Sequence, residues 1–339
     1  MTKQWDPLTD MPNLQGKVVL ITGGCTGIGY ETVRALVRRG AKVYFTGRSG
    51  SKAQKAKETQ LSRAPDIDPE NLQWLEMDLC DLKSIDAAAL ELGKRESKVD
   101  ILINNAAVST VATELVDGIW EQHMAGNFLG PFMFANRIMP LLKNAVKQGN
   151  ADIRIVNLGS IAHISMLPAN FDFHFDSATC FKQPITSYPV FWRYIGQYVI
   201  TFDIMRYAVS KNAIVIFTQE LQRRFNDQGL PILCTCVHPG EVLTEGVLAI
   251  NGLLLKTIAR LSFLTAEQGA VSPLFAATAE EVRTNAKTYE GKFLMPVGNV
   301  TEPNPVANNE GQVKGLWNVT TTELNKQLAV KKLPVLQAW

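Results

Sequence analysis

A glycine-rich turn directly after a short apolar run limits the possible folds of this chain more than any other feature. Residues 17–22 are Lys-Val-Val-Leu-Ile-Thr, and such a β-branched run is typical of a buried parallel strand. The glycines that follow at once are Gly23, Gly27 and Gly29. Residues 30–39 repeat apolar side chains at helical spacing, Gly40 ends the helix, and residues 42–46 predict a second strand. This unit predicts the dinucleotide-binding half of a doubly wound α/β fold.

The glycines have a physical reason in such a unit. Backbone N–H groups at the N-terminus of a helix bind a pyrophosphate only if no side chain intrudes between them. A glycine-rich turn without a ligand is the alternative interpretation. The strand, helix and second strand that surround this turn favour the nucleotide.

The end of the second strand indicates which nicotinamide cofactor is bound. An acidic residue there would bond the ribose 2′-hydroxyl of NAD and repel a 2′-phosphate. Here the strand runs into Arg48, with Lys52 close behind and no carboxylate. A guanidinium pairs well with a phosphate, so NADP is favoured over NAD.

Further apolar runs predict the rest of the sheet. The expected strands are residues 72–77, 99–103, 153–158, 232–237 and 292–295. Polar side chains follow three of them, at Asp78, Asn105 and Ser160, and doubly wound sheets place ligands at this edge. A helix cap or a plain turn is the local alternative for each. We expect one α/β domain with a Rossmann-like, doubly wound parallel sheet of about seven strands and helices on both faces.

Tyr207 and Lys211 form the second informative pattern. Residues four apart lie one above the other on a helix face. A cation beside a tyrosine favours the phenolate and lowers the tyrosine pKa, which suits proton transfer to or from a carbonyl or alcohol. By itself the pair is common, so its meaning depends on its neighbours in the fold.

Composition excludes several classes of function. Of 339 residues 46% are hydrophobic and 19% charged, and the net charge of +2 suggests no nucleic-acid partner. The first fifteen residues lack a signal-peptide pattern, and no apolar run approaches a membrane span. We expect a cytoplasmic protein. Five scattered cysteines without a Cys-x-x-Cys pair argue against a metal site and for reduced thiols.

Taken together, the ordered motifs resemble the short-chain dehydrogenase/reductase family, in particular its branch of retinol-dehydrogenase-like enzymes and fungal biosynthetic oxidoreductases. The resemblance covers roughly residues 14–300 and leaves 301–339 as a C-terminal extension. It rests on Thr22-Gly23-x-x-x-Gly27-Ile28-Gly29, Asp78-Leu79, Asn104-Asn105-Ala106, Asn127, Ser160, Tyr207-x-x-x-Lys211 and Pro239-Gly240.

The resemblance implies a role for each matching residue. Tyr207 would be the catalytic acid/base, Lys211 would hold the nicotinamide ribose, Ser160 would bond the substrate oxygen, and Asn127 would hold a water in a proton relay. The implied cofactor contacts are Gly23, Gly27, Ile28, Gly29, Arg48, Asp78, Leu79, Asn105, Arg137, Tyr207, Lys211, Val242 and Thr244.

Three features depart from the family pattern. Ala107 stands where the family usually has glycine, which is a small change. Thr26 stands where many NADP-preferring members have a basic residue before the second glycine. Ser160 and Tyr207 are 47 residues apart (207 − 160), which is more than is usual, and an aromatic-rich insertion at about residues 163–206 separates them.

Two interpretations of the insertion remain open. It is a substrate lid, because aromatic surface suits a bulky apolar ligand, or it is a splice or gene-model artefact. Arg193-Tyr194 and Arg206-Tyr207 repeat one dipeptide, and removing residues 194–206 would restore the usual spacing.

These observations predict an NADP(H)-dependent oxidoreductase that acts on CH–OH groups of a hydrophobic small molecule and interconverts a secondary alcohol and a ketone, in secondary-metabolite biosynthesis. Two alternatives remain: a catalytically impaired NADP-binding scaffold or regulatory protein, and an enzyme of isomerisation or dehydration. The sequence leaves monomer or homo-oligomer open.

Overall fold

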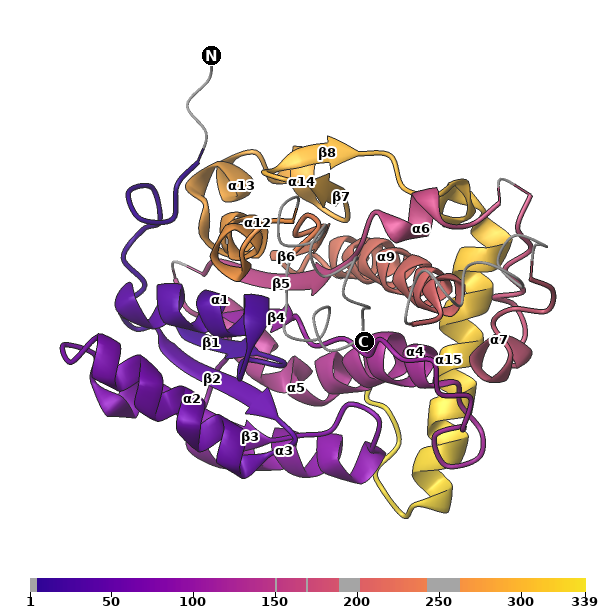
Figure 1. The fold of residues 1–339 in the computed structure, drawn as a ribbon, viewed down its shortest axis with the longest axis horizontal. Helices are drawn as coiled ribbons and strands as arrows, with labels where there is room; N and C mark the ends of the chain where they lie inside the picture. Colours follow the sequence, from indigo (N-terminus) through magenta and orange to yellow (C-terminus); the bar gives the residue numbers. More distant parts are fainter. Residues whose placement is uncertain (1–4, 150, 169, 189–201, 243–262) are drawn as a thin grey trace.

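An eight-stranded sheet forms the centre of the molecule in the computed structural model, which describes residues 5–149, 151–168, 170–188, 202–242 and 263–339 (Figure 1). The strand order is β3-β2-β1-β4-β5-β6-β7-β8. The strands are β1 Val18–Ile21, β2 Lys42–Gly47, β3 Leu72–Glu76, β4 Ile101–Asn104, β5 Ile153–Leu158, β6 Ile232–Val237, β7 Phe293–Met295 and β8 Asn299–Thr301. The predicted doubly wound parallel sheet is confirmed. The count of about seven omitted β8, a three-residue edge strand that pairs antiparallel to β7.

Alternating side chains bury the strands on both faces. In β1, Val18 and Leu20 belong to one apolar cluster, while Val19 and Ile21 belong to the other. This alternation follows from the period of two along a strand. Since both faces are apolar, each must be covered by helices.

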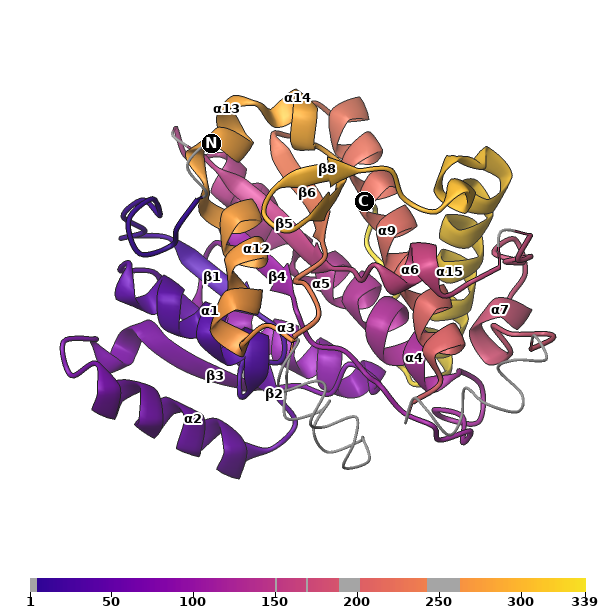
Figure 2. The ribbon, with the colours of Figure 1, turned by 45° about the horizontal axis from the view of Figure 1, so that its top comes forward.

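The helices form two layers (Figure 2). One cluster joins the sheet to α1 (Gly27–Arg38), α2 (Gly50–Arg63) and α12 (Ala266–Thr278). The other joins it to α3 (Leu82–Arg95), α5 (Gly130–Val146) and α9 (Ile204–Asp227). Shorter elements are α4 Gln122–Met124, α6 Ala162–Ser165, α7 Thr179–Lys182, α13 Glu280–Thr284, α14 Ala286–Tyr289, the 3₁₀ turns Pro69–Asn71 and Pro305–Asn308, and a π-helix at Ala125–Leu129.

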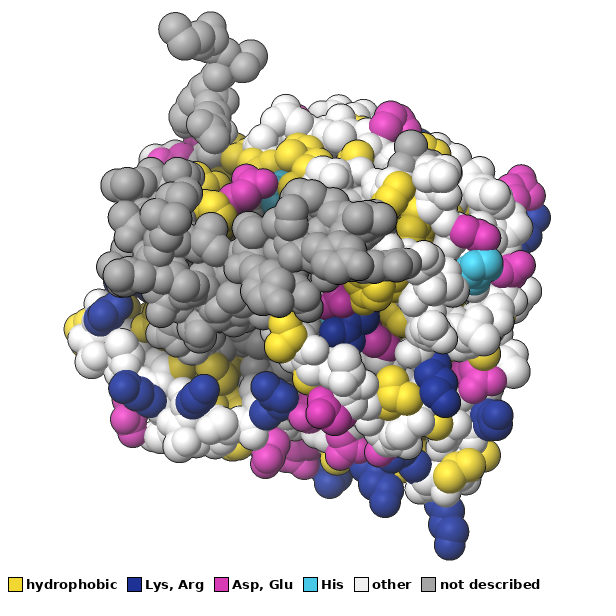
Figure 3. Space-filling view, turned by 45° about the vertical axis from the view of Figure 1, so that its right-hand side comes forward, with side chains coloured by type: hydrophobic (Ala, Val, Ile, Leu, Met, Phe, Trp, Pro, Cys, Tyr) yellow, Lys and Arg dark blue, Asp and Glu magenta, His cyan; other side chains and the backbone are white. Residues whose placement is uncertain are grey.

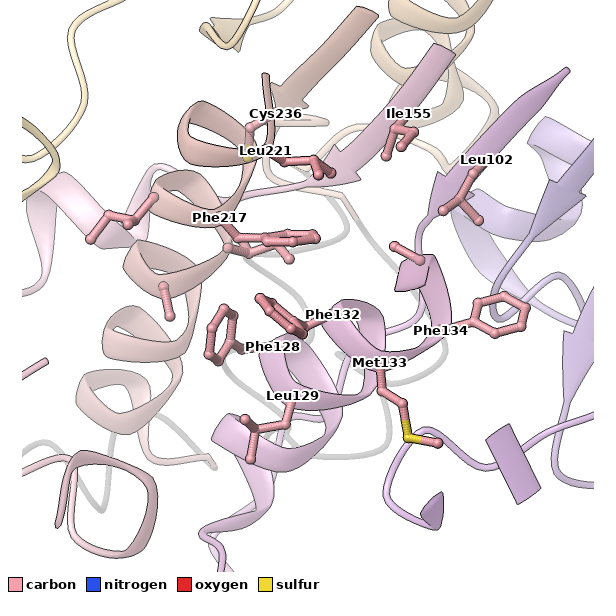
Figure 4. Packing of buried hydrophobic residues seen from close by; sticks show 14 of the residues in the cluster. Leu102, Phe128, Leu129, Phe132, Met133, Phe134, Ile155, Phe217, Leu221 and Cys236 are labelled. Carbon is pink, nitrogen blue, oxygen red and sulfur yellow. The ribbon is translucent and has the colours of Figure 1, made fainter. Parts of the chain in front are cut away.

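The C-terminal part of the chain adds to the second layer. Helix α15 (Glu310–Val330) packs against α9 and places Trp317 next to Phe132 and Phe217, with ring centroids 5.1 and 6.1 Å away. Trp339 completes the aromatic group, 4.9 Å from Phe132. Figure 4 shows Phe132 of α5 and Phe217 of α9 pointing toward each other. Residues beyond 301 therefore share the core of the domain.

Much of the described aromatic insertion is also core. Phe173, Phe175 and Phe181 are almost fully buried in the cluster that contains α9 and α15, and the Phe175 amide donates to Gln312 Oε1 of α15. For these three rings the lid interpretation is wrong, because they face the interior. Most of the repeated segment 194–206 lies outside the described residues.

The described surface mixes both signs of charge. Figure 3 shows basic and acidic side chains interspersed over the part of this face that is described. Among the described helices, none is long and apolar enough to cross a bilayer.

The aromatic group between α5, α9 and α15 should carry a large share of the stability. We expect Trp317→Ala to lower the free energy of unfolding by about 3–5 kcal/mol, because a buried ring is lost and a cavity remains. Chemical denaturation followed by circular dichroism measures this. Val330→Ala, an exposed change on the same helix, is the control and should stay within about 0.5 kcal/mol of the wild type. A Trp317 variant as stable as that control would contradict the assignment.

Candidate active site

The glycine-rich turn between β1 and α1 is held in a conformation that other residues resist. Gly23 and Gly27 have φ of 71° and 59°, in the left-handed region. A Cβ at Gly29 would overlap the carbonyl oxygen of Gly23, so α1 starts in close contact with the turn. Asn105, just after β4, fixes this shape, because its Nδ2 donates to the carbonyl oxygens of Thr22 (2.9 Å) and Gly23 (3.1 Å).

The N-terminus of α1 keeps its amides free of a side-chain cap. Thr26 precedes the helix with no side-chain capping bond, whereas Ser49, Asp81 and Asp203 each cap the helix they precede. Uncapped N–H groups and the helix dipole favour an anion at this position. Ile28 lies in the first turn of α1 and packs against the core.

A second part of the edge is formed by residues after β2 and β3. The Arg48 side chain is 73% exposed, and its Nη1 lies 3.8 Å from Asp78 Oδ2. Asp78 Oδ1 accepts from the Cys80 amide at 2.9 Å, which fixes the carboxylate at the strand end. Leu79 packs partly buried against the core. Arg48 is thus accessible from solvent, and its ion pair with Asp78 is long and exposed.

Ser160, Tyr207 and Lys211 meet at the end of β5. The Tyr207 hydroxyl and the Ser160 hydroxyl share a hydrogen bond. Lys211 Nζ lies 5.5 Å from the centre of the Tyr207 ring and donates to the Leu158 carbonyl oxygen at 2.6 Å. Residues 47 positions apart in sequence therefore form one polar group beside the glycine-rich turn.

The pKa of Tyr207 differs from the expectation drawn from the sequence. Burial raises the pKa of Tyr207 to about 12, and the hydrogen bond with Ser160 offsets this only in part. The predicted lowering of the Tyr207 pKa by Lys211 is therefore not found. Burial lowers the pKa of Lys211 to about 8, because the ammonium is removed from water. At neutral pH Tyr207 is protonated, while Lys211 titrates close to neutrality.

Asn127 lies in the π-helix that precedes α5. Its Oδ1 accepts from the Val108 amide at 2.6 Å, and its Nδ2 donates to the Val108 carbonyl oxygen at 3.1 Å and to Ser210 Oγ at 3.0 Å. Asn127 thereby links the loop after β4 to α9, one residue from Lys211. Both polar atoms of the Asn127 side chain therefore have hydrogen-bond partners, as buried polar atoms in an apolar setting require.

A ladder of buried amides below the site was missed from the sequence. Asn104 Nδ2 donates to Asn157 Oδ1 at 2.7 Å, and Asn157 Nδ2 donates to Thr218 Oγ1 at 2.9 Å. These bonds join β4, β5 and α9 directly beneath Ser160 and Lys211. The signal in the sequence was the polar side chain of Asn157 in a strand that is apolar apart from Asn157 and Arg154.

Arg137 does not join the residues around the glycine-rich turn. Its Nε donates to Asp86 Oδ1 at 2.7 Å, and its two Nη atoms donate to the carbonyl oxygens of Pro334 and Val335. The predicted cofactor contact is wrong for this side chain, because a buried ion pair and the C-terminal segment occupy its donors. Val242 lies after β6 in a bridge with Leu264, and Thr244 lies outside the described residues.

Tyr207 has two aromatic neighbours, of which Phe202 belongs to the predicted aromatic insertion and His123 was missed from the sequence. Phe202 lies edge-on to the Tyr207 ring with centroids 5.4 Å apart, and His123 lies edge-on at 6.2 Å. Phe202 comes from the end of the insertion, shortly before Tyr207 in the sequence, and His123 comes from α4. They shape the surroundings of the reactive hydroxyl.

The site fits a nicotinamide dinucleotide. The close approach at Gly29 and the uncapped start of α1 suit a pyrophosphate, while Arg48 and Asp78 stand at the end where an adenosine would lie. Lys211 and Tyr207 lie with Ser160 at the opposite end of the site, where the nicotinamide would lie. The spacing of these groups along one sheet edge is that of a doubly wound dinucleotide site.

Comparisons with known proteins agree with this geometry. The family model described as short chain dehydrogenase matches residues 17–170. The chain is 35% identical over 330 residues to the short chain dehydrogenase/reductase dpchH of Colletotrichum higginsianum, covering 97% of this chain and 80% of the relative. It is 34% identical to retinol dehydrogenase 12 of Mus musculus, covering 93% and 88%. The fold matches NADPH-bound carbonyl reductase from chicken fatty liver, with a TM-score of 0.60, 22% identity and coverage of 89% and 99%.

The close approach at Gly29 gives a direct test of the nucleotide site. We expect Gly29→Ala to weaken NADPH binding at least about tenfold, because the new Cβ must displace the Gly23 carbonyl or the Asn105 amide. Fluorescence titration with NADPH measures the affinity. Gly93→Ala is the matched control, since a Cβ there meets no atom within 4 Å. Equal affinities of the two variants would exclude the turn as the binding site.

Proposed function

Because the chain belongs to the short-chain dehydrogenase/reductase family, we propose that it is an NADP(H)-dependent oxidoreductase interconverting a secondary alcohol and a ketone on a hydrophobic small molecule. One observation carries the proposal. Ser160, Tyr207 and Lys211 form a single polar group at the carboxyl end of β5, beside the glycine-rich turn.

In the reductive direction Tyr207 acts as the acid. The bound nicotinamide would supply the hydride to the carbonyl carbon. Ser160 donates a hydrogen bond to the substrate oxygen and Tyr207 gives that oxygen its proton, so the ketone becomes an alcohol and Tyr207 a phenolate. A Tyr207 pKa near 12 keeps the hydroxyl protonated at neutral pH, and the Lys211 ammonium stabilises the phenolate that forms.

Arg48 supports NADP as the cofactor. Its guanidinium is exposed at the end of β2, where a 2′-phosphate would lie, and the residues beside it are Gly47 and Ser49 rather than an acid. Asp78, at 3.8 Å, is a weak competitor for the guanidinium because both groups remain accessible to water.

The neighbours of Tyr207 support an apolar substrate. Phe202 is partly buried and lies edge-on to the Tyr207 ring, so it offers aromatic surface from the insertion beside the reactive residue. The fungal relatives are consistent with a role in secondary-metabolite biosynthesis.

The role of Tyr207 is tested by removing only its hydroxyl. We expect Tyr207→Phe to lower kcat at least about a hundredfold, because the proton donor is lost, while NADPH affinity stays within twofold. The ring itself and its contacts with Phe202 and His123 remain. Turnover of a carbonyl panel containing retinal, steroid ketones and benzil is followed by NADPH absorbance. Near-normal turnover by the variant would refute the proposal.

The same panel separates redox chemistry from isomerisation or dehydration. With NADPH deuterated at the transferred position, a reductase places the label in the alcohol product. Product that forms without the label would favour the non-redox alternatives.

The cofactor preference is tested at Arg48. We expect Arg48→Ala to raise the Kd for NADPH about tenfold to a hundredfold, because one charge-assisted contact to the phosphate is lost. The Kd for NADH should change less than threefold. Lys55→Ala, which removes an exposed positive charge from α2, is the control. An equal loss of affinity for NADPH and NADH would show that Arg48 does not contact the 2′-phosphate.

A further inference from the structure

The residue before Tyr207 belongs to a buried ionic cluster. Arg206 Nη1 donates to Glu121 Oε1 at 3.1 Å, and its Nε lies 2.9 Å from Asp203 Oδ2. The Arg206 and Glu121 side chains are only 10% and 4% exposed. Arg206 Nη1 also donates to the Ala112 carbonyl oxygen at 2.9 Å. The guanidinium therefore joins the loop after β4 to the start of α9.

Glu121 extends the cluster to the ring that faces Tyr207. Its Oε1 lies 2.6 Å from His123 Nδ1, and its Oε2 accepts from the Met124 amide at 2.9 Å. His123 Nε2 accepts from the Thr110 amide, which leaves Nδ1 as the ring nitrogen that faces Glu121. The same ring lies edge-on to Tyr207.

Asp203 fixes the first turn of α9 from the other side. Its Oδ1 accepts from the Arg206 amide at 3.0 Å and caps the helix, while its Oδ2 accepts from the Tyr188 hydroxyl. Tyr207 lies in this first turn, where helices fray unless they are capped. The cluster thus holds the backbone before Tyr207 and the ring beside it.

We propose that Arg206 and Glu121 are positioning residues, which hold Tyr207 at the hydrogen-bonding distance from Ser160 that proton transfer requires. This inference rests on the proposed function. The position of the Tyr207 hydroxyl is critical for the rate, because a displacement of about 1 Å in an active site lowers the rate roughly a hundredfold. Buried ion pairs add little net stability compared with apolar residues of similar size. Removing one partner alone is destabilising, because the other charge stays buried without it, so a variant that removes both charges separates the effect on geometry from the effect on stability.

The repeated Arg-Tyr dipeptide suggests a deletion variant that can be compared with the full chain. In a chain without residues 194–206, Arg193 would precede Tyr207, but Val190 would replace Asp203. The guanidinium would be retained and the capping carboxylate lost. We expect this form to lose kcat like the Arg206 variant below, which would also exclude the artefact interpretation of the segment.

The test compares Arg206→Met, Arg206→Met with Glu121→Gln, and Arg223→Met. Arg223 is the control, because it is a half-exposed arginine of α9 with ion pairs to Glu220 and Asp227. The measurements are kcat and KM with retinal or benzil, NADPH affinity, Tm, and hydrogen–deuterium exchange of residues 204–211.

We expect Arg206→Met to lower kcat about tenfold to a hundredfold, with NADPH affinity within twofold and faster exchange in the first turn of α9. The double variant removes both buried charges, so its Tm should recover toward the wild type while kcat stays low. Arg223→Met should match the wild type in kcat and exchange.

Two results would overturn the inference. One is wild-type kcat in Arg206→Met, and the other is a kcat that recovers together with Tm in the double variant. If Tyr207→Phe is inactive while Arg206→Met is active, the inference fails and the proposed function stands. If the wild type reduces no carbonyl, the proposed function fails, and unchanged exchange in Arg206→Met would then reject the positioning role as well.

Discussion

The hydrogen bond from the Lys211 ammonium to the Leu158 carbonyl oxygen connects the catalytic helix to the sheet. Burying an ammonium is costly unless it has a partner, and the last carbonyl of β5 is that partner. This bond fixes the position of α9 relative to the end of β5. It therefore also fixes the position of Tyr207 beside Ser160. The amides of Asn127 and Asn157 bind α9 at two further points, through Ser210 and Thr218, which lie about two turns apart.

Local patterns were enough to predict most of the fold. The apolar strands, the glycine-rich turn and the helix that follows each carry their signal within a few residues, so their order predicted the doubly wound sheet. Ser160 could be placed at the site because parallel strands bring their carboxyl ends to one edge, whereas Tyr207 and Lys211, on α9, were placed there by the family resemblance. The strand β8 was missed, since its three residues are largely exposed and show no alternation.

Other parts of the site depend on partners far away in the sequence. Arg206 and Glu121 are 85 residues apart, and neither belongs to a local motif. Arg137 was assigned to the cofactor from its place on the helix after Asn127, but Asp86 and the carbonyls of residues 334 and 335 occupy it. The predicted direction of the Tyr207 pKa was also wrong, because burial raises this pKa, and burial cannot be read from the spacing of two residues.

The π-helix at Ala125–Leu129 constrains the number of residues that this segment can contain. A π-turn holds one residue more than an α-turn, and each residue rotates a helix by about 100°. Deleting one residue here would leave α5 helical but turn Asn127 away from Val108 and Ser210, or turn the apolar face of α5 away from the sheet. Within Ala125–Leu129, the number of residues should thus be harder to change than their identity, the reverse of what holds for surface loops.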